Sequence, residues 1–172
     1  MAGMDAKTAA KLRSLLLDMP VAALATLHKG EPAVSMVPWV WSPELESFLI
    51  HVSGLATHTR DMQEHPRVSA MVMGRLGDAP SPQALPRISV QANARFLDKR
   101  DASAYAAQQA GYLARFPDAE IMFGLADFSL VALQPVSARL VAGFGQAYSL
   151  VGERLRAWLL ADDGHSEAAQ TA

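Results

Sequence analysis

Apolar and polar residues alternate along much of the chain in short runs, which is the pattern of half-buried β-strands. Turn-forming residues separate these runs, most clearly Lys29-Gly30 and the stretch 74–86, which is rich in proline and glycine. Pro135 interrupts the last apolar run. The pattern predicts seven strands, at residues 21–28, 33–41, 47–53, 67–73, 87–97, 127–134 and 136–142.

Helical spacing appears in fewer places. Leu12, Leu15 and Leu16 fall on one helical face, Asp5 can cap the start of that helix, and Pro20 ends it. The same reasoning predicts helices at 5–18, 54–64, 99–111, 117–123 and 153–161.

Strands predominate and their connections are short, so the first three strands are expected to form an antiparallel meander. An antiparallel sheet of six or seven strands closes most economically into a barrel, which removes its exposed edges. We therefore expect a mainly β fold with peripheral helices, in the α+β class. Residues 1–161 are expected to form a single domain, and residues 162–172 a disordered tail.

Composition narrows the functional classes. The chain has 172 residues, of which 51% are hydrophobic and 19% charged, and its formal net charge is −2. Those values describe a globular domain without the clustered basic residues that nucleic acid requires. The absence of cysteine excludes disulfides and thiolate chemistry. We see no signal peptide and no apolar run long enough to span a membrane, so a cytoplasmic location is expected.

The segment 51–60, HVSGLATHTR, holds the most informative candidate site. A strand ends there, a glycine turns the chain, and a short helix begins, which exposes backbone N–H groups that suit a phosphate. Ser53, Thr57 and Thr59 add hydroxyl groups, and His58 and Arg60 add cations. A purely structural alternative stays open, in which Ser53 caps the helix and Arg60 pairs with a glutamate one turn later.

A second candidate segment is Ser35-Met36-Val37-Pro38. Proline lacks an N–H group, so Pro38 marks an edge, a bulge or a place where the backbone can face a flat ring. Arg87, at the start of the fifth strand, can bind a phosphate or a flavin carbonyl. The alternatives are a plain edge strand for the first segment and an exposed strand-end charge for Arg87.

Other patterns carry less chemistry. The glycines of Gly143-Phe144-Gly145 favour a tight turn over a dinucleotide-binding loop. The five histidines show no metal-ligand spacing, so no metal site is predicted. No residue is assigned a catalytic role.

Taken in order, these segments resemble the FMN-binding split barrels of the pyridoxamine 5′-phosphate oxidase-like superfamily, nearest the branch of haem-utilisation proteins. The resemblance rests on LATHT at 55–59, PRVS at 66–69, PRISVQANARF at 86–96 and GFGQA at 143–147. It extends from about Leu15 to about Tyr148. It implies a split β-barrel and a homodimer with FMN at the subunit interface.

The resemblance also implies roles for the candidate residues. Residues 35–38 would lie along the flavin, and Arg87 would stand where relatives carry a flavin-contacting glutamine. The strand end His51, Val52 and Ser53 would lie near the ribityl chain. The phosphate would be held by Thr57, His58, Thr59 and Arg60.

Departures from the family pattern limit the function. Pyridoxamine phosphate oxidases carry basic residues where this chain has Ser35, Val40, Thr57 and His58, so oxidation of pyridoxine phosphate is not expected. Each charge-assisted phosphate contact is worth roughly 1.5–3 kcal/mol. Two functions stay open: an FMN-dependent oxidoreductase, or a non-catalytic protein that binds flavin or haem. Relatives in the haem branch often carry an added C-terminal region with a histidine, whereas this chain has only His165 in the expected tail, so the residues do not support haem ligation there.

Overall fold

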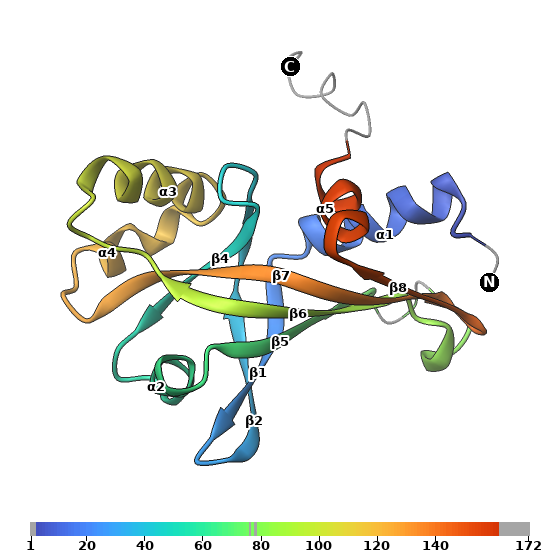
Figure 1. Ribbon diagram of the computed structural model, residues 1–172, viewed down its shortest axis with the longest axis horizontal. Helices are drawn as coiled ribbons and strands as arrows, with labels where there is room; N and C mark the ends of the chain where they lie inside the picture. Colours follow the sequence, from blue (N-terminus) through green and yellow to red (C-terminus); the bar gives the residue numbers. More distant parts are fainter. Residues whose placement is uncertain (1–2, 76, 78, 162–172) are drawn as a thin grey trace.

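The structure, a computed structural model, describes residues 3–161 except 76 and 78, and these residues form eight strands, five α-helices and two short 3-10 helices, Pro82–Ala84 and Pro117–Ala119. The strands make one antiparallel sheet in the order β2-β1-β5-β6-β7-β4-β3, and β8 pairs with β7 (Figure 1). The predicted α+β class is confirmed. The strands are β1 (Val21–His28), β2 (Glu31–Pro38), β3 (Val40–Ser42), β4 (Ser47–Ser53), β5 (Arg67–Met73), β6 (Arg87–Phe96), β7 (Phe128–Gly143) and β8 (Gln146–Val151).

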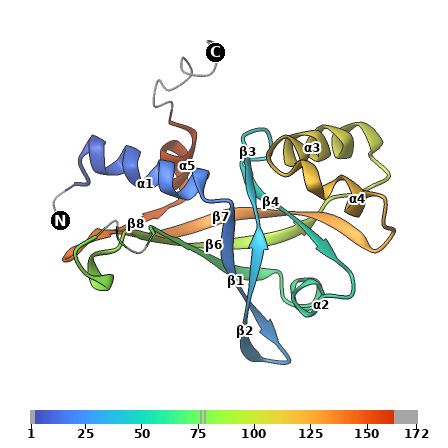
Figure 2. The same ribbon diagram turned by 180° about the vertical axis from the view of Figure 1, so that it is seen from behind.

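The helices lie in three places around the sheet. They are α1 (Ala6–Asp18), α2 (Thr57–Glu64), α3 (Ala102–Arg115), α4 (Glu120–Phe123) and α5 (Gly152–Leu160). Helices α3 and α4 cover one end of the sheet beside β4, whereas α1 and α5 pack together near both chain ends (Figures 1 and 2). Helix α2 packs on β1, and the β1–β2 hairpin projects away from α1 and α5.

The chain crosses from one end of the strand order to the other at Trp39. The backbone N–H of Trp39 donates to the carbonyl oxygen of Pro20 at 3.0 Å, and its indole N–H donates to that of Met19 at 2.9 Å. Its ring stacks on Phe48 with 4.0 Å between centroids. The predicted single strand 33–41 is therefore wrong, because this corner divides it into β2 and β3. The predicted antiparallel pairings of the first three strands are confirmed, as the β1–β2 and β3–β4 hairpins, but the corner places these hairpins at opposite ends of the strand order, so they do not form one continuous meander.

The predicted break at Pro135 is also wrong, because β7 continues through it. On one edge, β7 pairs with β4 as far as Leu133 and with β8 from Ser137 onward. The three residues between them have no partner strand on that edge, so a missing N–H costs little there. The β6–β7 register shifts at the same level, between Gln91 and Ala92.

Strand β8 was not predicted. Its sequence QAYSLV is polar enough to read as a loop, and only its pairing with the exposed edge of β7 makes it a strand. The turn before it contains Gly145 at φ +74°, which confirms the tight turn predicted for residues 143–145.

Helix starts follow their capping residues. Asp5 accepts a hydrogen bond from the Thr8 N–H at 3.0 Å, which confirms the predicted cap. Asp101 caps α3 in the same way, so the helix predicted at 99–111 begins and ends later in the chain. Helix α2 begins at Thr57, and its N-cap Ala56 offers no side-chain acceptor. The predicted role of Ser53 as the cap of that helix is therefore wrong.

Two apolar clusters lie on opposite faces of β4, which is why this strand reads as an almost continuous apolar run. Phe48, Ile50 and Val52 point into the main core inside the barrel. Leu49 points the other way, into a smaller cluster with Tyr112 beneath α3. No helix among the described residues is long and apolar enough to cross a membrane. Residues 162–172 lie outside the described residues, so the predicted tail stays a prediction.

Candidate functional site

One face of the sheet points outward across five strands. Cross-strand register places in one row the residues Met36, Ala23, Met71, Ser89 and Arg139. Residues directly opposite each other point to the same face, so the row marks a continuous outer surface. At the β2 end this surface is apolar, with Val34 73% exposed and Met36 65% exposed.

At the other end of the sheet, two open hollows share Arg139 and residues 145–147: one lies on the outer face, and the other follows the β8 edge toward α5 and the start of the chain. Together they form what we call the arginine trough. Their volumes are about 570 and 970 Å³, and both are lined by Arg139 and residues 145–147. Arg87 lines one hollow and Arg154 the other. Among the described residues that line them there is no carboxylate. The trough is therefore a cationic surface set beside apolar side chains.

The apolar part of the trough comes from strands and from the β7–β8 turn. Met71, Val141 and Phe144 line the first hollow, and Tyr148 and Trp158 line the second. Phe144 is 85% exposed at the tip of the turn. This combination can accept a flat apolar molecule that carries negative groups at its margin.

The guanidinium of Arg87 turns back toward the preceding loop. It donates to the carbonyl oxygens of Leu85 at 3.1 Å and Gln83 at 3.3 Å. Arg139 donates to the hydroxyl of Ser149 at 3.0 Å. Both arginines hold neutral partners and keep donors for an anion.

The predicted segment 35–38 lies on β2, an edge strand of the sheet, which confirms the edge position inferred from Pro38. Its side chains alternate between the two faces. Met36 points outward, whereas Val37 is buried in the main core. The hydroxyl of Ser35 is buried without a hydrogen-bond partner. Of these side chains, Met36 belongs to the outer face that leads to the trough.

The predicted phosphate segment is divided by the structure. Thr57 and Arg60 line an open hollow of about 290 Å³ beside β1, which we call the α2 hollow. Thr59 points inward, where its buried hydroxyl donates to the carbonyl oxygen of Ser53 at 2.7 Å. His58 is not among the residues that line the hollow, and burial lowers its pKa although Asp61 opposes this shift.

The end of the fourth strand is likewise separated from both hollows. Val52 is buried in the main core. Ser53 donates to the carboxylate of Asp127 at 2.5 Å and accepts from the Leu55 N–H at 3.1 Å. The Gly54 N–H donates to the Asp127 carbonyl oxygen at 2.7 Å, so these contacts hold the β4–α2 turn against the start of β7.

His51 lies in an aromatic cluster beneath α3 and α4. Its ring stacks on Phe123 at 3.8 Å and meets Tyr112 edge-on at 5.8 Å. It is 9% exposed, and neither ring nitrogen has a hydrogen-bond partner. Burial lowers the pKa of His51 to about 4, with a smaller contribution from Lys99, and burial raises the pKa of Tyr112 to about 12. His51 is therefore neutral at pH 7.

A hydrogen-bonded group at the α2 hollow was not predicted from sequence. The buried carboxylate of Asp61 accepts from the Thr26 hydroxyl at 2.7 Å and bonds Nδ1 of His28 at 2.8 Å. Burial raises the pKa of Asp61, but the hydrogen bonds from His28 and Thr26 outweigh it and hold that pKa below its ordinary value. These residues are far apart in the chain, so no local pattern could indicate the group.

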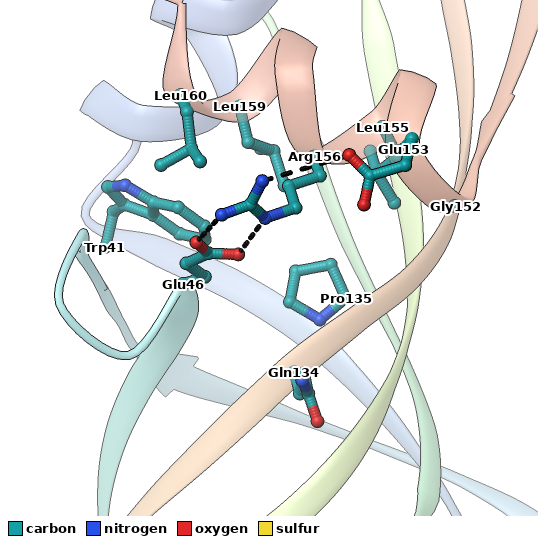
Figure 3. A pocket seen from close by; sticks show the side chains of 10 residues that line it. All are labelled: Trp41, Glu46, Gln134, Pro135, Gly152, Glu153, Leu155, Arg156, Leu159 and Leu160. Carbon is teal, nitrogen blue, oxygen red and sulfur yellow. Dashed lines mark hydrogen bonds and ion pairs between the residues drawn. The ribbon is translucent and has the colours of Figure 1, made fainter.

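Another pocket lies between α5 and the β3–β4 turn, and Figure 3 shows it. Its volume is about 230 Å³. Leu159 and Trp41 line it together with an ion pair between Arg156 and Glu46. The pocket is therefore lined by apolar side chains, by this ion pair, and by the polar side chains of Gln134 and Glu153.

Two trough residues, Arg139 and Arg154, were also absent from the sequence-based candidates. Arg139 lies in a predicted strand and Arg154 in a predicted helix, where exposed arginines are common. The proximity of Arg139 to Arg87 follows from the β6–β7 register, and both hollows are completed by β8, a strand that was not predicted.

The fold and its outer face define an antiparallel split-barrel protein with a cationic, partly apolar trough. Comparison with known families agrees: the pyridoxamine 5′-phosphate oxidase family matches residues 8–142. The chain belongs to this family. The resemblance recognised from the sequence motifs is thus confirmed.

Two curated relatives are named for haem chemistry. The chain is 34% identical over 146 residues to heme oxygenase HutZ of Vibrio cholerae, a match covering 83% of this chain and 80% of the relative. It is 31% identical over 127 residues to the chloroplastic non-canonical heme oxygenase HOZ of Arabidopsis thaliana. That match covers 73% of this chain but only 36% of the plant protein.

Solved structures give the same picture. A heme binding protein from Mycobacterium smegmatis superposes with a TM-score of 0.76 at 25% identity, over 91% of this chain and 62% of that one. HutZ from Vibrio cholerae, described there as a heme storage protein, superposes with a TM-score of 0.63 at 27% identity, over 85% and 93% of the two chains.

Proposed function

We propose that this protein binds haem in the arginine trough, as a homodimer, and acts as a haem oxygenase. The observation that carries the proposal is the trough itself, where Arg87, Arg139 and Arg154 meet apolar side chains with no carboxylate among the described lining residues. The names of the relatives at 34% and 31% identity support haem as the ligand.

The residues fit the chemistry of haem. Haem is a flat apolar ring with two carboxylates on one side. Arg139 and Arg87 lie on neighbouring strands of the same outer face, with Ser89 opposite Arg139 and Val141 opposite Arg87. Diagonal neighbours in a sheet are about 7–8 Å apart, so the two guanidinium groups can serve separate carboxylates. Met71 and Phe144 would contact the ring.

A homodimer would complete the site. The outer face joins the trough to the exposed apolar side chains of Val34 and Met36. Pairing this face with that of a second copy would cover those side chains and close the trough from above. Haem, when bound, supplies the iron at which dioxygen is activated, and the protein would bind the ring and exclude water from it.

FMN receives less support at the predicted phosphate segment. The pKa of His58 is lowered by burial, so its imidazole is mainly neutral at pH 7. The Thr59 hydroxyl is already bonded to the Ser53 carbonyl oxygen. A flavin phosphate there would meet Arg60 and a hydroxyl from Thr57 without the pair of cations typical of the family.

Absorbance spectroscopy tests the proposal. Haemin added to the purified protein should give a Soret band that saturates with one haem per subunit, whereas FMN should bind more weakly. Replacing one charge-assisted contact, in Arg139→Gln, should weaken haem binding about tenfold. Arg95→Gln is the matched control, because Arg95 is exposed on β6 and lines neither hollow.

Turnover tests the oxygenase part. With a reductant and dioxygen, the Soret band of the bound haem should decay in the wild type. Haem binding without decay would limit the function to storage. Binding of FMN in preference to haemin would contradict the proposal altogether.

A further inference from the structure

The strands β2, β3 and β8 differ in how their open edges are protected. β2, at one end of the strand order, carries Glu31, Pro32 and Pro38, and β3, at the other end, has only three residues. β8 pairs with β7 on one side, and its other edge has no partner strand among the described residues. Its sequence QAYSLV contains no proline and no charge. Proteins usually protect an open edge with proline, charge or short length, so β8 lacks the devices that prevent pairing with a further strand.

A hollow follows this open edge. The second hollow of the trough is lined by the consecutive residues 145–150, which cover the β7–β8 turn and all of β8 except its last residue. Met4 and Trp158 line it from the start of the chain and from α5, and β8 lies below α1 and α5 in Figure 1. Its volume is about 970 Å³. An open strand edge along a hollow is the arrangement in which an extended peptide adds a strand to a sheet.

The backbone of β8 has hydrogen-bonding groups available for such a peptide. Apart from the pairing with β7, residues 146–150 make no backbone hydrogen bond within the described part of the chain. Successive residues of a strand direct their N–H and C=O groups to opposite edges, so alternate residues of β8 direct theirs into the hollow.

The charge of the hollow selects the kind of segment that can bind. Arg154 lines it from α5 and forms no ion pair with a carboxylate among the described residues. Arg139 also lines it, and its one observed side-chain partner is the neutral hydroxyl of Ser149, at 3.0 Å. Pairing with β8 of a second copy would bring these arginines toward their own counterparts, whereas an acidic segment would neutralise them.

We propose that the open edge of β8 binds an extended acidic segment of another protein, which adds a strand to the sheet and places carboxylates against Arg154 and Arg139. Main-chain hydrogen bonds to β8 would give affinity, and the arginines would select acidic side chains. The haem proposal uses Arg87, Met71 and Phe144, which line only the first hollow. The two ligands would therefore meet only at Arg139 and residues 145–147.

Calorimetry on the full chain with designed peptides tests this surface. A peptide of alternating glutamate and valine, blocked at both ends, should bind and should slow hydrogen exchange of the β8 amides. A lysine–valine peptide of the same length should not bind. A glutamate–valine peptide with every backbone amide N-methylated keeps the charges but cannot donate to the strand edge, so it should not bind either.

Variants locate the binding site on the protein. Arg154→Gln removes one charge-assisted contact and should weaken binding of the glutamate–valine peptide about tenfold. Arg95→Gln is the matched control, because Arg95 is exposed on β6 and lines neither hollow. Arg87→Gln should weaken haem binding and leave peptide binding unchanged, so this proposal and the haem proposal can fail independently.

Four results would overturn the proposal. Two are no binding of the glutamate–valine peptide at millimolar concentration, and equal binding of the methylated or lysine-containing peptide. A third is binding that appears only after Asp162, Asp163 and Glu167 are replaced by their amides, which would assign the hollow to this chain's own residues. The fourth is dissociation of a homodimer by the peptide in ultracentrifugation, which would assign the edge of β8 to a second copy.

Discussion

Arg156 on α5 donates two hydrogen bonds to the carboxylate of Glu46, with Nε–Oε2 at 2.7 Å and Nη2–Oε1 at 2.5 Å. Figure 3 shows this fork beside Trp41. Glu46 has a left-handed backbone, at φ +47°, which is uncommon for a residue other than glycine, asparagine or aspartate. The β3–β4 turn therefore presents a carboxylate to the last helix from an unfavourable conformation.

The first prediction concerns this contact. Arg156→Gln should increase hydrogen exchange of the α5 amides by a factor of a few, because a solvent-exposed pair contributes modestly. The pKa of Glu46 is lowered chiefly by its hydrogen bonds to Arg156. The pair therefore stabilises α5 fully above pH 4.5, and this contribution is lost as the pH falls through the lower folded value.

Arg154→Gln is the control for that measurement, since it makes the same change on the same helix without breaking an observed ion pair with a carboxylate. Equal exchange rates in the two variants at pH 7 would show that the fork does not hold α5.

The second prediction concerns the proposed homodimer. Met36→Lys places a charge in the exposed apolar part of the outer face and should weaken self-association at least about tenfold, as measured by analytical ultracentrifugation. Ile121→Lys is the matched control, because Ile121 is equally apolar and 83% exposed but lies on α4. A dimer that is unchanged by Met36→Lys would place the interface elsewhere.

Sequence patterns predicted the strand-rich class, the α1 cap and the glycine turn, because each depends on neighbouring residues. They failed where the structure depends on which strands pair in the sheet. Pro135 reads as a strand end, yet it lies where β7 lacks a partner strand on one edge. Strand β8 reads as a loop, yet it completes the trough. The residues next to one another in the sequence do not show which edge of a strand lacks a partner in the sheet.

The candidate site, like the fold, was predictable from sequence only where it depends on neighbouring residues. Arg87 was selected from its strand position, and it lines the trough. Arg139 was not, because its relation to Arg87 needs the β6–β7 register. His28 and Asp61 meet because α2 packs on β1, which the spacing of apolar residues does not specify.

The third prediction concerns the iron ligand of the proposed haem complex. No histidine is among the described residues that line the trough, and His165 lies outside the described residues. His165 is the histidine in the part of the chain where relatives of the haem branch often carry one, and we test it as the ligand. His165→Ala should shift the Soret band of the ferric complex and weaken haem binding about tenfold or more. His65→Ala, at the end of α2, should leave the spectrum unchanged. If His65→Ala shifts the Soret band and His165→Ala does not, the iron ligand is His65.

The last prediction concerns the pH dependence of stability. The pKa of His51 falls to about 4 in the folded protein, against 6.5 for an ordinary histidine. Between these values the unfolded chain binds a proton that the native state does not, so stability falls as the pH drops from 6.5 to 4 and is unaffected above 6.5. The effect is on the order of 3 kcal/mol at most. His51→Phe keeps the stacking on Phe123 and removes the titrating group. Urea unfolding at pH 7 and pH 5 should show a smaller stability difference for this variant than for wild type, and an equal difference would mean that folding does not lower the pKa of His51.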